Sequence, residues 1–174
     1  MSSKRTIAGV SGAVVLLICT CAPVFAGNAA ADACSLLSQA RVREVLGVQV
    51  GAGAHAGENR ALPGSHTSTR ASCAWYENGA ASIGSKRVLI TVLGPMGSLT
   101  PVQRFENAKP PVPRIAKTPV KGVGDDAVYV TTGMTTSMYV KKGSSVFQIL
   151  VSGFPAEEAK TMEKTLAQDA LAKL

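Results

Sequence analysis

Histidine, the commonest catalytic base and metal ligand, occurs only twice in the 174 residues, at His55 and His66. Both lie in the glycine-rich stretch 51–70, and no Cys, His or carboxylate pattern with zinc spacing surrounds them. Ser65 precedes His66, but adjacency in sequence does not show that a hydroxyl and an imidazole meet as nucleophile and base. We therefore expect no metal site, no cofactor and no catalytic site.

Asp125 and Asp126 are adjacent carboxylates that follow the sequence Gly-Val-Gly at 122–124. Neighbouring side chains of an extended chain point to opposite sides, so this pair is not arranged as a general acid and base. We interpret the segment as a turn that leads into a strand, with a cation or catalytic site as the alternative. The Gly-Ala-Gly at 51–53 lacks the preceding strand and following helix of a phosphate-binding loop.

The first 26 residues have the three-part layout of a secretory signal peptide. Lys4 and Arg5 precede an apolar stretch over 7–18, and small residues follow over 22–26. The apolar stretch is shorter than the roughly 20 residues that cross a bilayer as a helix. We predict cleavage after Ala26 and an exported protein, periplasmic or secreted.

Two cysteines within this segment leave a second interpretation open. A lipoprotein signal ends at a cysteine that becomes acylated, and Cys19 or Cys21 would then anchor the protein to the membrane. The residues before them, Ile18 and Thr20, are not the small residues usually found there. We favour a soluble exported protein and keep lipid anchoring as the alternative.

Cleavage of the 174-residue chain would leave 148 residues, enough for one domain. We expect a featureless leader over 27–33 and a single domain over 34–174. Only Cys34 and Cys73 remain, and an even pair in an exported protein predicts a disulfide. The bridge would close a loop of about 40 residues and stabilise the fold by about 4 kcal/mol.

The hydrophobic pattern predicts an α+β domain. Helices are expected over 39–46, 100–109 and from Pro155 onward, and strands over 72–77, 86–93, 127–131, 135–141 and 144–152. The proline-rich segment 109–121 should be extended as edge or crossover chain, and 51–70 should be a loop whose ends the disulfide ties. This order predicts an antiparallel sheet of about five strands whose helices, including the N- and C-terminal ones, pack on one face.

Basic side chains are in excess. Removing Lys4 and Arg5 lowers the formal net charge from +7 to +5, which suits an envelope containing anionic polymers. No nucleic-acid motif or aromatic stacking run occurs, so we expect no nucleic-acid partner. Around the proline-rich segment, with only Glu106 among them, lie Arg104, Lys109, Arg114, Lys117 and Lys121. This strip is either a solvated edge or a surface for an anionic ligand or partner, because prolines lower the ordering cost of binding.

Aromatic residues offer a second candidate for ligand contact. Trp75 and Tyr76 lie on the strand that carries Cys73, and Tyr129 lies on a later strand. A binding module that works through its sheet is expected to show a concave face or pocket lined by Trp75, Tyr76 or Tyr129.

Four short motifs occur one after another along the predicted domain. They are Cys34-Ser35-Leu36-Leu37, Leu46-Gly47, Cys73-Ala74-Trp75 and Gly122-Val123-Gly124-Asp125-Asp126-Ala127. The sequence resembles a broad group of exported bacterial domains with a C-x-L-L opening, a Leu-Gly helix end, a C-x-W strand and a G-x-G-D-x-A turn. That group includes uncharacterised actinobacterial lipoproteins and is similar to extracellular sensor domains of some membrane serine/threonine kinases. The resemblance implies an exported α+β domain with Cys34 and Cys73 paired and no shared catalytic constellation.

These observations favour a non-enzymatic binding or sensing module of the cell envelope. Its partner would be an unknown envelope component or protein. The first alternative is an inhibitor or immunity-type protein that blocks an envelope hydrolase with a rigid loop. An enzyme of unknown type is the third.

Overall fold

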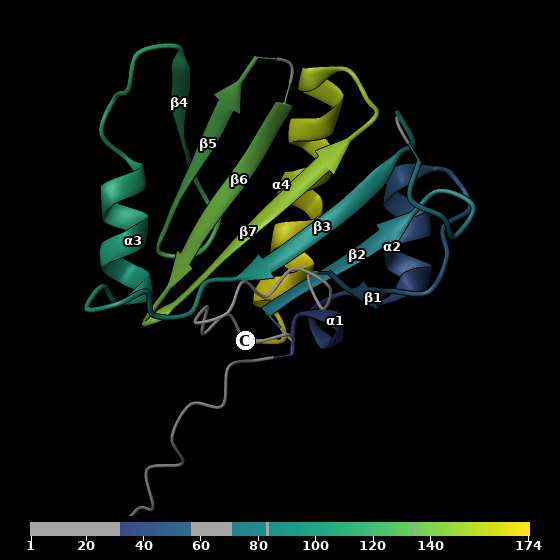
Figure 1. The fold of residues 1–174 in the computed structure, drawn as a ribbon, viewed down its shortest axis with the longest axis horizontal. Coiled ribbons are helices and arrows are strands. Elements are labelled where there is room, and N and C mark those ends of the chain that lie inside the picture. The colour runs from purple at the N-terminus through teal and green to yellow at the C-terminus, as the bar shows by residue number, and fades with distance from the viewer. Residues whose placement is uncertain (1–31, 57–70, 83, 134) are drawn as a thin grey trace, which may run out of the picture.

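The computed structural model describes residues 32–56, 71–82, 84–133 and 135–174, which form one sheet with helices against both faces (Figure 1). The predicted signal peptide, its cleavage site, Cys19, Cys21 and most of the predicted leader lie outside the described residues. None of the described helices is long and apolar enough to cross a membrane.

The sheet is antiparallel throughout and has seven strands in the order β1-β2-β3-β7-β6-β5-β4. The strands are β1 (Ala54–His55), β2 (Ser72–Tyr76), β3 (Arg87–Val92), β4 (Ile115–Val120), β5 (Asp126–Thr132), β6 (Thr135–Lys142) and β7 (Ser145–Ser152). All five predicted strands are present, but the predicted number of about five is wrong because each edge carries one more. β1 is too short to show a hydrophobic period. β4 lies in the proline-rich segment, and an edge strand tolerates Pro119 because its outer side needs no N–H donor.

Four helices accompany the sheet: α1 (Ala33–Leu36), α2 (Gln39–Leu46), α3 (Pro101–Ala108) and α4 (Ala156–Leu171). The Ser38 hydroxyl accepts a hydrogen bond from the Arg41 N–H at the start of α2, and Gly47 ends that helix with a φ of 65°. Thr100 and Gln103 form a capping box at the start of α3. The sequence analysis missed α1 because a single turn shows no helical period.

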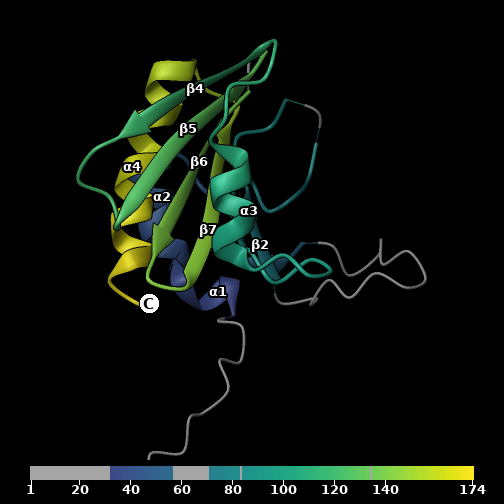
Figure 2. The ribbon, with the colours of Figure 1, turned by 90° about the vertical axis from the view of Figure 1, so that its left-hand side faces the viewer.

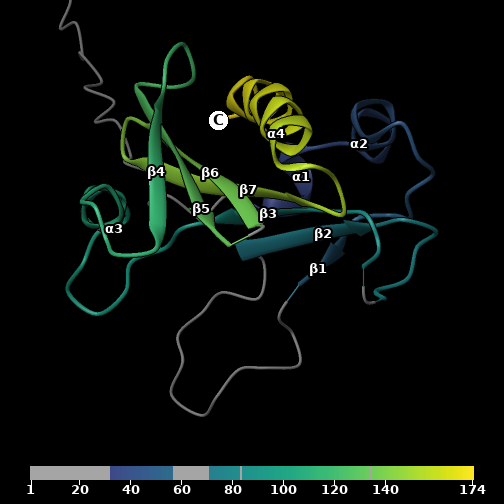
Figure 3. The same ribbon diagram turned by 90° about the horizontal axis from the view of Figure 1, so that it is seen from above.

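Two separate apolar clusters lie on the two faces of the sheet. The view from above shows α1, α2 and α4 on one side of the sheet and α3 on the other (Figure 3). Helices α1, α2 and α4 cover one face, and their main partners are Trp75, Ile90, Met138, Phe147 and Ile149. Helix α3 lies against the other face, where Phe105 is fully buried with Leu93, Val128 and Val146 (Figure 2). The expected packing of the N- and C-terminal helices on one face is confirmed. The expectation that every helix shares that face is wrong for α3, since β5 and β7 carry apolar side chains on both faces.

Candidate functional site

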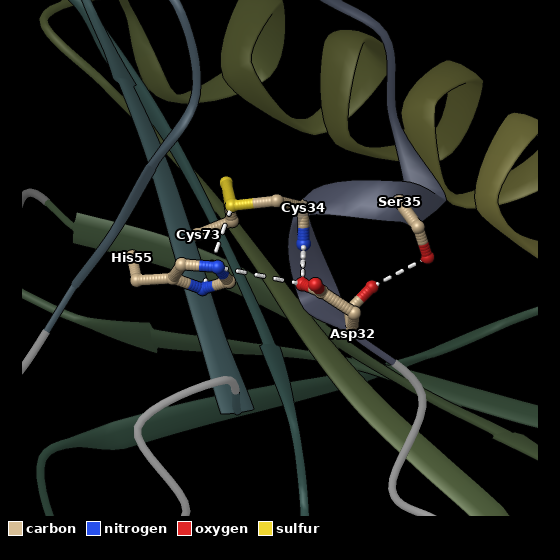
Figure 4. The surroundings of a disulfide bond; sticks show 5 residues. All are labelled: Asp32, Cys34, Ser35, His55 and Cys73. Atoms are coloured by element: carbon tan, nitrogen blue, oxygen red, sulfur yellow. Dashed lines mark hydrogen bonds and ion pairs between the residues drawn. A yellow bond between two sulfur atoms is a disulfide. The ribbon is translucent and has the colours of Figure 1, made fainter.

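The predicted pairing of Cys34 with Cys73 is confirmed, and the disulfide joins α1 to β2 (Figure 4). The two sulfur atoms are 2.01 Å apart, and the bridge spans 39 positions of sequence. Cys73 is fully buried, whereas Cys34 is partly exposed. Disulfides persist in oxidising compartments, so the bridge indicates a non-cytoplasmic environment.

Strand β1 places His55 directly beside this disulfide. His55 pairs with Cys73 across the β1–β2 ladder, and its Nδ1 lies 3.7 Å from the Cys34 Sγ. Its Nε2 lies 3.8 Å from the Asp32 Oδ1, which also accepts a hydrogen bond of 3.0 Å from the Cys34 N–H. One ligand atom from each of Asp32, Cys34 and His55 lies within 4.8 Å of the other two, the one such group among the described residues.

The sequence analysis expected no metal site at His55 because the two histidines lie in a pattern without zinc-ligand spacing. The side chains of Asp32 and Cys34, which His55 meets in the fold, are more than 20 positions away from it in sequence. No local spacing signals such a cluster. The glycine-rich stretch around His55 shows neither hydrophobic period, so β1 itself went unrecognised. The other histidine, His66, and Ser65 lie outside the described residues.

The basic strip predicted around the proline-rich segment is largely engaged within the fold. Lys109 contacts Asp126 at 2.6 Å and Glu106 at 3.1 Å, and hydrogen bonds to both carboxylates raise its pKa, that to Asp126 most. Lys141 also contacts Glu106 at 3.1 Å, and hydrogen bonds from Lys141 and Lys109 lower the pKa of Glu106. Lys109 is therefore neutralised locally.

The remaining members of the strip do not form one surface. The Arg104 Nη1 donates a hydrogen bond of 2.7 Å to the Gly94 carbonyl, and the Lys117 Nζ donates one to the Pro110 carbonyl. Arg114 and Lys121 are exposed. Three of the five cations thus have partners within the described chain, which favours the solvated-edge interpretation over a continuous anion-binding surface.

Asp125 and Asp126 point to different partners, as expected of neighbours in an extended chain. Asp125 holds the β6–β7 turn, because its Oδ2 accepts a hydrogen bond of 2.7 Å from the Gly143 N–H and its Oδ1 contacts the Lys142 Nζ at 3.0 Å. The Gly143 hydrogen bond contributes most to lowering the pKa of Asp125. Asp126 pairs with Lys109. The two carboxylates therefore have separate structural partners.

The three aromatic residues predicted to bind a ligand do not line a common surface. Trp75 is 1% exposed and packs in the core on the face covered by α1, α2 and α4, so it lines no surface. Its indole ring lies so close to the backbone that a Cβ at Gly53 would come within 2.7 Å of it. Tyr129 lies on the same face, and its hydroxyl donates a hydrogen bond of 2.6 Å to the Lys160 carbonyl. Burial raises the pKa of Tyr129 to about 12.

Tyr76 is the exception, because strand alternation places it on the opposite face, half-buried. Half-buried side chains on the same face of β2, β3 and β7 are Ser72, Tyr76, Leu89, Thr91, Gln148 and Leu150. Leu89 lies opposite Leu150, and Thr91 lies opposite Gln148. We call this set the open face, because among the described helices only α3 lies on this side, centred on a neighbouring cluster around Phe105.

Sequence reasoning also missed a buried carboxyl group. Glu163 of α4 is 0% exposed, and its Oε1 accepts a hydrogen bond of 3.0 Å from the Val151 N–H. Its Oε2 has no hydrogen-bond partner in the described part of the chain. Burial raises the pKa of Glu163 to about 8. A signal was available, since Glu163 follows the buried Ala159 by four positions and therefore lies on the inner side of α4.

Comparisons of the chain with protein-family models, curated proteins and solved structures find no match. The resemblance to exported bacterial sensor domains therefore remains a prediction.

Proposed function

We propose that this protein is a non-enzymatic binding module of the cell envelope that contacts its partner through the open face. The observation that carries the proposal is the pair Leu89 and Leu150, two aliphatic side chains side by side in the middle of a strand face and only half-buried. Adjacent apolar side chains that the fold leaves partly uncovered are typical of contact surfaces.

The neighbours of the leucine pair suit a protein or small-molecule contact. Tyr76 supplies an amphipathic ring of the kind enriched at interfaces. Thr91 and Gln148 supply hydroxyl and amide groups that orient a bound molecule through hydrogen bonds. All of them lie on strands of a hydrogen-bonded sheet, so they are held in place before binding and little order is lost on contact.

The open face is less suited to catalysis than to binding. None of the side chains that make up the open face is a carboxylate, histidine or cysteine, so it offers no general acid and base. The Asp32–Cys34–His55 cluster is built around a cysteine that is already in a disulfide and is therefore no nucleophile.

Site-specific photo-crosslinking tests the proposal. A benzophenone amino acid placed at Thr91 should capture a discrete partner from envelope fractions, and excess unlabelled protein should compete for it. The same probe at Gln168, which is exposed on α4, is the matched control and should capture nothing discrete. Thr91→Arg should abolish capture from a probe at Tyr76, whereas Gln168→Arg should not. Equal capture from both sides, or none from the open face, would contradict the proposal.

A second candidate function rests on a different feature. Met96 is 57% exposed at a tight turn in which Met96 and Leu99 exchange two backbone hydrogen bonds of 3.0 Å. An exposed apolar side chain on an ordered turn is the kind of group that an inhibitor inserts into a hydrolase pocket. Capture of a hydrolase from a probe at Met96, and not from Thr91, would favour the inhibitor.

A further inference from the structure

The geometry points to a metal site that forms when the disulfide is reduced: we infer that Cys34, Cys73, His55 and Asp32 then bind one Zn²⁺ ion. The inference is independent of the proposed function, because it concerns the opposite face of the sheet and a different chemistry.

Reduction changes what the cluster offers to a metal. In the disulfide form only His55 and Asp32 present good ligand atoms, and two ligands do not make a zinc site. A dithiol reductant gives up two electrons and two protons, becomes a disulfide itself, and leaves Cys34 and Cys73 as two thiols. Zinc then displaces one proton from each thiol. The result is two thiolates, an imidazole and a carboxylate, the number and kind of ligands that tetrahedral zinc takes.

The distance between His55 and Cys34 is close to the one that this coordination needs. Zinc–nitrogen and zinc–sulfur bonds of about 2.0 and 2.3 Å at a tetrahedral angle place the nitrogen and sulfur about 3.5 Å apart. The His55 Nδ1 and the Cys34 Sγ are 3.7 Å apart in the structure. A carboxylate oxygen of Asp32 lies within 4.8 Å of the Cys34 Sγ and of one ring nitrogen of His55. Cys73 is bonded to Cys34 and lies opposite His55 in the β1–β2 ladder, so breaking the disulfide frees its sulfur to turn toward an ion held by the other three residues.

Backbone hydrogen bonds hold these ligands in addition to the disulfide. Strand β1 keeps His55 opposite Cys73 through its ladder with β2, which continues in a hydrogen bond of 3.0 Å from the Ala56 N–H to the Ser72 carbonyl. Asp32 is held at the start of α1 by the Cys34 N–H. His55 and Asp32 are 29% and 37% exposed, which gives an ion a path to the site. A bound zinc would replace the disulfide as the link between α1 and β2.

Cobalt titration of the purified protein tests the inference, because Co²⁺ bound tetrahedrally by thiolates gives characteristic visible and charge-transfer absorption. After reduction with a phosphine, the protein should bind one equivalent of Co²⁺, and Zn²⁺ should displace it. The oxidised protein should bind neither ion. Absence of the tetrahedral spectrum in the reduced protein would overturn the inference.

Variants separate this site from adventitious binding to two free thiols. His55→Ala and Asp32→Asn should each weaken Zn²⁺ binding by the reduced protein at least about tenfold, in line with the cost of disturbing zinc ligation. Asp125→Asn is the matched control, since Asp125 also accepts a backbone N–H, and it should leave the affinity unchanged. Equal affinity of the His55→Ala variant would overturn the assignment.

The inference can also be tested if reduction unfolds the protein. If the reduced protein unfolds, stoichiometric Zn²⁺ should restore the buried environment of Trp75, read by its fluorescence, in the wild type and not in His55→Ala. Failure of Zn²⁺ to restore it would count against the site.

Discussion

Glu163 should make the protein lose stability as the pH rises from acid to mildly alkaline values, and Glu163→Gln should remove that loss. The carboxyl group is 0% exposed beneath α4, with one oxygen bound to the Val151 N–H and the other without a partner among the described residues. Desolvation is the largest cause of the raised pKa, and it outweighs the Val151 hydrogen bond and the positive charge of Lys160, both of which lower the pKa.

The sign follows from proton binding in the two states. The pKa of Glu163 is about 8 in the folded protein against an ordinary value of 4.5. Between these values the folded protein keeps a proton that the unfolded chain releases, so the free energy of unfolding falls as pH rises. Each pH unit costs up to about 1.4 kcal/mol, which gives roughly 3 kcal/mol by pH 7 and an upper bound of about 5 kcal/mol by pH 8.

Glutamine keeps an oxygen for the Val151 N–H and carries no charge at any pH. The variant should therefore match the wild type near pH 5 and exceed it by several kcal/mol at pH 8. Urea unfolding from pH 5 to pH 8, followed by the fluorescence of Trp75, the only tryptophan, measures the difference. Glu158→Gln, on the exposed side of the same helix, is the control and should follow the wild type. Parallel pH profiles for the Glu163→Gln variant and the wild type would refute the reasoning.

Three further predictions concern the scaffold. Gly124→Ala should lower the free energy of unfolding by more than about 2 kcal/mol, because Gly124 has a φ of +59° and the new Cβ would collide with the Lys141 carbonyl of β6. Gly122→Ala is the control: Gly122 has a φ of +75° but open space around it, so the loss in urea unfolding should be no more than about 1–2 kcal/mol. Thr100→Ala should lose the capping box and about 1 kcal/mol, with retained stability in Thr100→Ser as the control. The double variant Cys34→Ala/Cys73→Ala should lose about 4 kcal/mol of unfolding free energy by the same assay, because the disulfide no longer restricts the unfolded chain over 39 positions of sequence. A loss below about 1 kcal/mol would contradict this entropic argument.

Local patterns in the sequence were sufficient for the longer helices, for the five inner strands and for the disulfide, but not for α1 or the edge strands β1 and β4. The cap at Ser38 and the stop at Gly47 mark α2 by chemistry that acts within a few residues. Strand alternation predicts β2, β3, β5, β6 and β7 in the same way. Two cysteines in the predicted domain leave one pairing, so the bridge needed no knowledge of the fold.

Only the tertiary structure decided which groups meet. The sequence shows that α3 has an apolar side, but not which face of the sheet it covers. It could not show that Trp75 faces the core while Tyr76 faces outward, that Lys109 is neutralised by Asp126, or that His55 lies against the disulfide. The physical reason is the same in each case. Helical and strand periods arise from interactions between residues a few positions apart, whereas these contacts join distant parts of the chain that only the packed sheet brings together.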